Sequence, residues 1–179
     1  MKGVLPIFLA IYCCWYIAEY PVEERTAYVA SLYVGHKETA HNRSELIDYW
    51  NSRLGIPPGS NYCASFVSFV LDSAMVNYPG TRSGVAQHFI TSESIPAARV
   101  AAGKQVPKGY IAVWKRGDTW MGHVEFVRKP WQGPSGYTIG ANTTPGSGGD
   151  LSRGYGVYAR KRHIDPTAFL RITHFTPVY

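Results

Sequence analysis

The chain has 179 residues, of which 45% are hydrophobic and 14% aromatic. This is enough apolar material for the core of one domain. Eighteen basic against twelve acidic residues give a net charge of +6, which favours anionic partners such as an anionic cell-wall polymer or a membrane surface. No arginine-rich run or nucleic-acid-binding motif accompanies this charge, so nucleic acid is not expected as a partner. The three cysteines, Cys13, Cys14 and Cys63, resemble neither a disulfide framework nor a metal-ligand cluster, and no metal is expected.

Residues 1–20 have the pattern of a signal or membrane-anchoring segment. A positively charged start leads into an apolar run too short to span a membrane comfortably, and Pro6 weakens a spanning helix further. The cleavage site is poor because Tyr16 stands where a small residue is expected, so cleavage, lipidation at Cys13 or Cys14, and retention all stay open. We expect export to the periplasm, the cell envelope or the medium, with membrane attachment through this segment as one outcome. The alternative is a first helix of a cytoplasmic protein.

Residues 21–179 are expected to form a single domain that begins with a helical lead at residues 21–58. A proline followed by two glutamates suits the start of a helix over residues 21–37. Ser44 is a good N-cap for a second helix, which has an apolar face and ends near residue 54.

The second half of the chain is rich in short strand-like runs, whereas the segment between residues 74 and 106 reads as irregular with room for one short helix. Helices first and strands afterwards predict an α+β domain with an antiparallel sheet of about five strands. The runs contain β-branched and aromatic residues and are separated by Gly, Pro and Asp turns. They are residues 110–114, 123–128, 137–141, 156–161 and 169–174.

Cys63 directly follows a loop and begins a third, almost wholly apolar helix that runs to about Ala74. Gly59, Ser60 and Asn61 are expected to supply the turn and the N-cap. A thiol at a buried helix N-terminus lies near unpaired backbone N–H groups and the positive end of the helix dipole, and both favour the reactive thiolate. The same N–H groups can stabilise an oxyanion on the carbon that sulfur attacks. The alternative is that Cys63 only packs, since free cysteines are usually buried.

A cysteine nucleophile needs a base within hydrogen-bond reach and a third group that orients the base. His123 follows a glycine at the start of a strand-like run, and Asn142 stands at the end of the next one, where it could orient an imidazole on the adjacent strand. Cys63, His123 and Asn142 thus occur in the order and structural context of papain-like triads. His88, in the irregular segment, is the other candidate base.

An ordered set of short motifs runs through the chain after the N-terminal segment. Its members are NYCASFV at 61–67, GYIAVW at 109–114, GHVEFV at 122–127, YTIGANT at 137–143 and GYGVYARKR at 154–162. As a set, they resemble the successive motifs of a CHAP domain, the cysteine, histidine-dependent amidohydrolase/peptidase family of papain-like cell-wall hydrolases of bacteria and phages. The resemblance includes the helical lead and so covers most of the chain.

This resemblance implies a papain-like fold that hydrolyses amide bonds in peptidoglycan, without a metal or organic cofactor. By matching motifs, Cys63 would be the nucleophile, His123 the base and later the acid, and Asn142 the orienting residue. The attack would give a thioester acyl-enzyme, which water releases. The bond could be the lactyl-to-alanine amide, a stem-peptide bond or a cross-bridge. Tyr62 and Trp114 are candidates for the substrate cleft, although Trp114 could equally be a core residue.

The chain departs from the family pattern at two positions. Many relatives carry a carboxylate just before the asparagine motif, where this chain has Gly140. The orienting role then falls to Asn142 alone or is supported by Glu125, which is predicted to share a strand face with His123. Tyr110 stands where the family usually has an aspartate, and this affects local geometry more than activity.

Two alternatives to a peptidoglycan hydrolase stay open. The first is a catalytically weak module that keeps the fold and holds cell wall through its basic, aromatic surface. Gly140 and Tyr110 favour this reading, whereas the intact set of nucleophile, base and orienting residue argues against it. The second is a cysteine peptidase that acts on protein.

Overall fold

The computed structural model describes residues 19–78, 80–145 and 154–179. The predicted signal-like segment therefore lies almost entirely outside the described residues. Within the described ranges, no helix is both long enough and apolar enough to cross a membrane.

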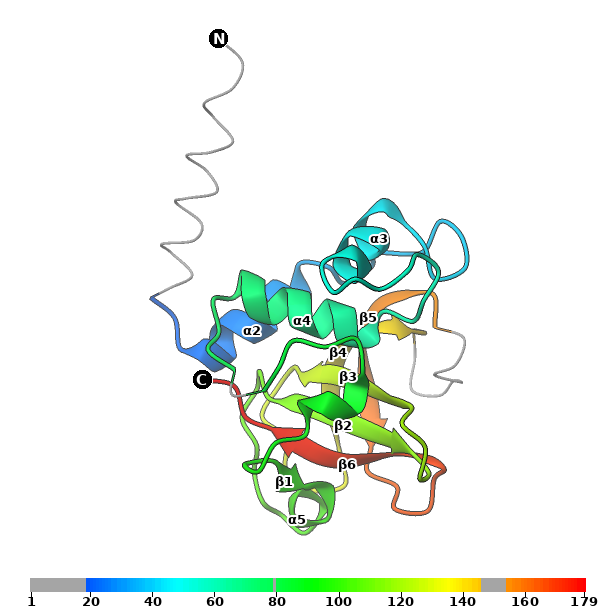
Figure 1. The fold of residues 1–179 in the computed structure, drawn as a ribbon. Helices are drawn as coiled ribbons and strands as arrows, with labels where there is room; N and C mark the ends of the chain where they lie inside the picture. Colours follow the sequence, from blue (N-terminus) through cyan, green and yellow to red (C-terminus); the bar gives the residue numbers. More distant parts are fainter. Residues whose placement is uncertain (1–18, 79, 146–153) are drawn as a thin grey trace.

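In the described part of the chain, three helices precede the sheet and lie together on one side of it (Figure 1). They are α2 (Val22–Ser31), α3 (Glu45–Ser52) and α4 (Cys63–Ser73). The predicted N-cap of α3 is confirmed, because the Ser44 hydroxyl accepts a hydrogen bond from the backbone N–H of Ile47 at 3.1 Å.

The predicted N-cap of α4 is wrong. The residue at the cap position is Tyr62, and its side chain makes no capping hydrogen bond. Gly59, Ser60 and Asn61 form the approach to the helix, and Ser60 and Asn61 act elsewhere: the Ser60 carbonyl accepts from Asn51, and the Asn61 side chain accepts from Asn142. The first turn of α4 therefore begins without a side-chain oxygen on its N–H groups.

The described residues contain one open antiparallel sheet of six strands in the order β1-β6-β2-β3-β4-β5. Five of them match the five predicted runs. The sixth, β1, was missed because two residues carry no periodicity. The strands are β1 (Ile95–Pro96), β2 (Ile111–Arg116), β3 (Gly122–Val127), β4 (Ser135–Thr143), β5 (Gly156–His163) and β6 (Leu170–Thr176).

The segment predicted as irregular contains two short helical elements, the 3-10 helix η1 (Ala86–Phe89) and α5 (Ala97–Ala101). α5 packs against β6 and β1, at the opposite end of the molecule from α3 (Figure 1). η1 packs against β2 and β3.

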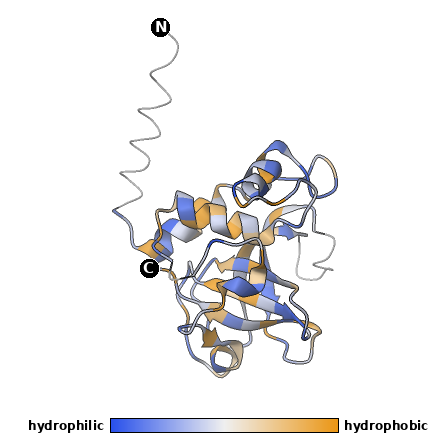
Figure 2. Ribbon diagram, in the orientation of Figure 1, coloured by the Kyte–Doolittle hydropathy of each residue, from blue (hydrophilic) through white to orange (hydrophobic). Residues whose placement is uncertain are grey.

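Two hydrophobic clusters cover the two faces of the sheet. In β2, Ile111 and Val113 belong to the cluster under α2, α3 and α4, whereas Ala112 and Trp114 belong to the cluster that includes α5. This alternation is the period of two that a strand buried on both faces imposes. Figure 2 shows apolar residues along α4 and along the strands of the sheet.

Candidate functional site

Cys63 is the first residue of α4 and is buried, with 6% of its surface exposed. α4 packs on β3 and β4, which places its N-terminus against the strands that carry the other predicted site residues. The helix also packs against α2 and α3, and the ring of Phe66 lies 5.1 Å from that of Trp50. The position of the thiol is therefore set by a packed helix.

His123 begins the buried part of β3, and its Nε2 lies 2.8 Å from Oε1 of Glu125. The imidazole also lies close enough to the Cys63 thiol for that group to act on its pKa. Burial lowers the pKa of the imidazole, but the hydrogen bonds and charges of Cys63 and Glu125 outweigh it, and the pKa of His123 is raised above its ordinary value. The site therefore favours imidazolium beside the sulfur.

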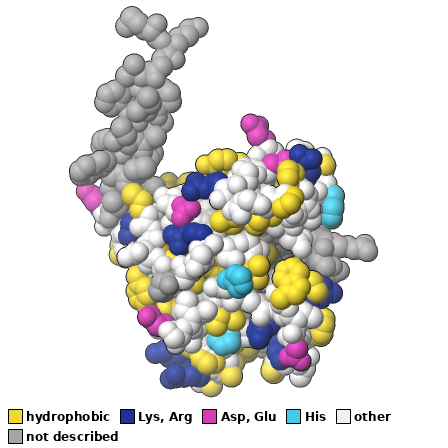
Figure 3. All heavy atoms as spheres, viewed as in Figure 1, with side chains coloured by type: hydrophobic (Ala, Val, Ile, Leu, Met, Phe, Trp, Pro, Cys, Tyr) yellow, Lys and Arg dark blue, Asp and Glu magenta, His cyan; other side chains and the backbone are white. Residues whose placement is uncertain are grey.

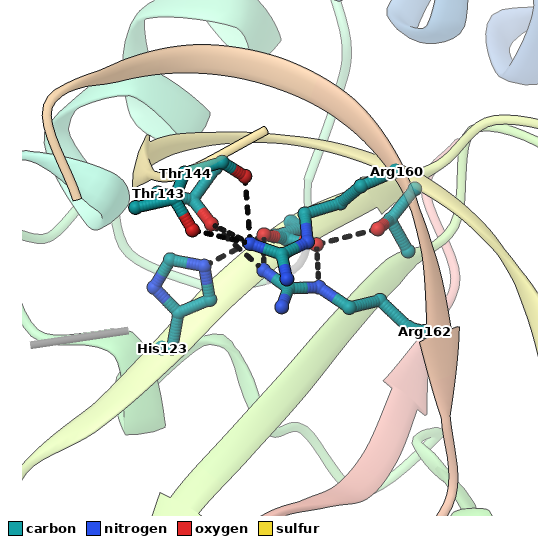
Figure 4. A network of polar contacts seen from close by, with 7 residues as sticks. His123, Thr143, Thr144, Arg160 and Arg162 are labelled. Atoms are coloured by element: carbon teal, nitrogen blue, oxygen red, sulfur yellow. Dashed lines mark hydrogen bonds and ion pairs between the residues drawn. The ribbon is translucent and has the colours of Figure 1, made fainter. Parts of the chain in front are cut away.

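Glu125 lies two residues after His123 on the same face of β3 and has no exposed surface. Its carboxylate accepts hydrogen bonds from His123, from the Thr138 hydroxyl and from two nitrogens of Arg162, with Nε of Arg162 at 2.9 Å (Figure 4). Burial raises the pKa of this carboxyl, but the charge and hydrogen bonds of Arg162 and His123 hold it well below its ordinary value. Glu125 is therefore a buried, ionised acceptor for His123.

Gly140 explains how the carboxylate fits. A Cβ atom at position 140 would lie 2.2 Å from Cγ and 2.5 Å from Oε1 of Glu125, so only glycine leaves room for this side chain over β4. The space beside position 140 is therefore filled by a carboxylate that comes from the neighbouring strand.

Asn142 does not orient His123, so this prediction is corrected. Its Nδ2 donates to Oδ1 of Asn61 at 3.0 Å, and its backbone has the left-handed φ of 54°. Asn142 instead holds the loop just before Cys63, and the acceptor for His123 is Glu125. The irregularity in the β4–β5 register between Gly140 and Thr143 includes this residue and turns its side chain toward that loop.

The two predicted cleft residues lie in the interior. Tyr62 has no exposed surface, and its hydroxyl donates to Glu38 at 2.9 Å. Trp114 is 3% exposed and packs edge-on against His123 with ring centroids 5.4 Å apart. The cleft prediction is therefore wrong for Tyr62, whose hydroxyl is bonded to Glu38 in the interior. For Trp114 the alternative of a core residue is confirmed. The other candidate base, His88, is exposed and pairs with the Ser83 hydroxyl at 2.8 Å.

Sequence reasoning missed Arg160, Arg162 and Thr138. Both arginines come from β5 and are buried beside the site, with 3% and 7% of their surface exposed (Figure 4). The available signal was the spacing of Arg160 and Arg162, which places both on the same face of β5. Buried basic side chains require hydrogen-bond acceptors. No residue spacing indicated that the acceptor of Arg162 would be Glu125, two strands away, or that Arg160 would bond to Thr143 and Thr144.

Within the described ranges, no group of three His, Cys, Asp or Glu side chains is arranged to hold a metal ion. On the face shown in Figure 3, basic and acidic side chains are interspersed with hydrophobic ones. Comparisons with family models, with curated proteins and with solved structures found no match.

Proposed function

We propose that this protein is a cysteine-dependent hydrolase of amide bonds with a papain-like arrangement of its helix and sheet, and that its substrate is peptidoglycan. The observation that carries the proposal is the buried imidazole of His123, which bonds to Glu125 and lies near the Cys63 thiol at the N-terminus of α4. A nucleophile, a base and a group that orients the base are the three parts that covalent acyl transfer requires.

The proposed reaction begins with transfer of the Cys63 proton to His123, which the raised pKa of the imidazole and the ionised Glu125 favour. The thiolate attacks the amide carbon, and the backbone N–H of Cys63 at the uncapped start of α4 stabilises the resulting oxyanion. His123 gives its proton to the departing amine, which leaves a thioester. Water, deprotonated by His123, then attacks the thioester, releases the carboxylic acid and restores the thiol.

Peptidoglycan is proposed as the substrate because of the ordered CHAP-like motifs and the net charge of +6. The basic charge suits a wall that carries anionic polymer. The lactyl-to-alanine amide and the stem-peptide or cross-bridge amides share the same chemistry. They are distinguished by the termini that cleavage creates.

The experiment is digestion of purified peptidoglycan by the full chain beside Cys63→Ala, with mass spectrometry of the soluble products. We expect new fragments from the wild type and none from the variant, and the new termini identify the bond. Binding of both proteins to the wall without fragments would contradict the hydrolase and favour the wall-binding module. Cleavage of a denatured protein substrate but not of peptidoglycan would favour the peptidase.

A further inference from the structure

Arg162 is a buried residue of β5 that bonds directly to Glu125. Its Nε and Nη2 both bond to the Glu125 carboxylate, and Nη2 also donates to the Thr143 hydroxyl at 3.0 Å. The guanidinium lies over the Trp114 ring, 5.3 Å from its centroid. Trp114 in turn packs edge-on against His123, so one aromatic ring supports both the arginine and the base.

This paired geometry solves a problem that burial creates for Glu125. An isolated carboxylate without exposed surface is protonated through most of the neutral range, because burial without a counter-charge raises its pKa by several units. A protonated Glu125 would be neutral, with a hydroxyl in place of one carboxylate oxygen, and would no longer stabilise an imidazolium. A planar guanidinium that bonds both carboxylate oxygens prevents this and also fixes the plane of the carboxylate.

We propose that Arg162 is a positioning residue of the Cys63 site: through its two bonds to Glu125 it holds the carboxylate in the orientation and charge state that His123 requires. The inference rests on the proposed function in taking Cys63 as a nucleophile, and it assigns a role to the last of the CHAP-like motifs, residues 154–162. Arg162 acts through Glu125 and does not touch the reacting sulfur.

The charged and polar groups around Glu125 come from three strands. His123 lies on the same strand, Thr138 on β4, and Arg162 on β5. Arg160, also on β5, adds only a more distant positive charge, because its hydrogen bonds go to Thr143 and to the backbone and hydroxyl of Thr144. Arg160 is therefore a matched control: it is an equally buried arginine of the same strand that makes no bond to the carboxylate.

The test is the pH dependence of Cys63 alkylation by iodoacetamide in the full chain, which requires no substrate. Labelling is followed at Cys63 by peptide mass spectrometry, since Cys13 and Cys14 also react. The variants are Arg162→Gln, Arg162→Lys and Arg160→Gln. Thermal unfolding is recorded for each, so that a loss of stability is separated from a change in reactivity.

We expect the alkylation midpoint of Arg162→Gln to rise by about one pH unit or more, because a protonated or misoriented Glu125 no longer favours the imidazolium that accompanies the thiolate. Arg162→Lys keeps a charge but loses the planar pairing, and its midpoint should lie between those of the wild type and Arg162→Gln. Arg160→Gln should lower the melting temperature with its midpoint within about 0.3 unit of the wild type.

Where Arg162→Gln does not fold, Arg162→Lys and Thr138→Val carry the test. Thr138→Val removes another bond to Glu125 and should shift the midpoint in the same direction by a smaller amount. Unchanged midpoints in these variants, an equal shift in Arg160→Gln, or a shift to lower pH would overturn the inference.

The same data separate this inference from the proposed function. A wild-type Cys63 that reacts at low pH only when His123 is present, as shown by His123→Ala, supports the site even where peptidoglycan is not cleaved. An ordinary thiol profile that His123→Ala does not change would overturn both the nucleophile and the role of Arg162.

Discussion

Two residues compete for the role of orienting His123, and their hydrogen bonds separate them. Glu125 bonds to the imidazole, whereas Asn142 bonds to Asn61 in the loop before Cys63. We predict that Glu125→Gln lowers kcat/KM on a cleaved peptidoglycan fragment by at least about 10²-fold, because an amide keeps the shape but does not stabilise the imidazolium.

The Asn142→Ala variant should lower the same constant by only about tenfold, since Asn142 supports the loop and leaves the base oriented. The pH dependence of kcat/KM also distinguishes Glu125 from Asn142 as the residue that orients His123. Asn142→Ala should keep the wild-type profile, whereas Glu125→Gln should move its acid limb to higher pH. A larger loss in Asn142→Ala than in Glu125→Gln would restore Asn142 as the orienting residue.

Gly140 leaves the space that the Glu125 side chain fills, and this packing can be tested by mutation. Gly140→Ala places a methyl group inside the volume of the Glu125 side chain, which its bonds to His123, Thr138 and Arg162 prevent from moving aside. We expect the free energy of unfolding to fall by about 1–3 kcal/mol, the usual range for overpacking, measured by urea denaturation.

A double-mutant cycle tests the cause of that loss. In a Glu125→Ala background the space beside position 140 is vacated, so Gly140→Ala should cost clearly less than in the wild type. Equal costs in the two backgrounds would show that the strain comes from the backbone of β4 and not from the carboxylate.

Among the helices, α4 determines where Cys63, the proposed nucleophile, stands, and its packing on α3 can be tested by mutation. Phe66 has no exposed surface and contacts both Trp50 and Tyr33. Phe66→Ala should lower the free energy of unfolding by about 3–5 kcal/mol, because it leaves a cavity between α3 and α4. Phe169→Ala is the matched control: this ring is 62% exposed, and its removal should cost less than about 1 kcal/mol.

The elements that sequence reasoning located are those whose signal is local. The Ser44 side chain predicted the start of α3. The runs that form β2 to β6 were recognised by their β-branched and aromatic residues and by the turn residues between them. β1 and α5 are too short to carry a period; β1 pairs with β6, and α5 packs on β6 and β1.

In the site, Cys63 and His123 could be selected from residue type and context, but the third member could not. The choice between Asn142 and Glu125 depends on the β4–β5 irregularity and on an arginine two strands from the carboxylate. Both are features of strand register, and a register is set by the whole sheet. In the sequence, Gly140 stands where many CHAP relatives have a carboxylate. In the structure, the absence of a side chain at this position leaves room for the carboxylate of Glu125.

At the scale of the whole molecule, three partly or fully buried histidines couple folding to pH with different signs. Burial lowers the pKa of His36, and burial together with Lys115 lowers the pKa of His174. Such groups bind a proton more readily in the unfolded chain, so their contribution to stability is present above about pH 6.5 and is lost as the pH falls. His123 has a raised pKa, so its contribution is present below that pH and is lost as the pH rises through the raised value.

These signs predict how three variants differ from the wild type when unfolding by urea is measured between pH 8 and pH 5. His36→Gln and His174→Gln should each lose less stability than the wild type as the pH falls, because each removes a group that protonates preferentially in the unfolded chain. His123→Gln should lose more, because the wild-type histidine gains a favourable charge beside Glu125 over the same range. A His123→Gln curve parallel to the wild type would show that the imidazole takes up no extra proton on folding, and the proposed base would then lack the raised pKa on which the mechanism relies.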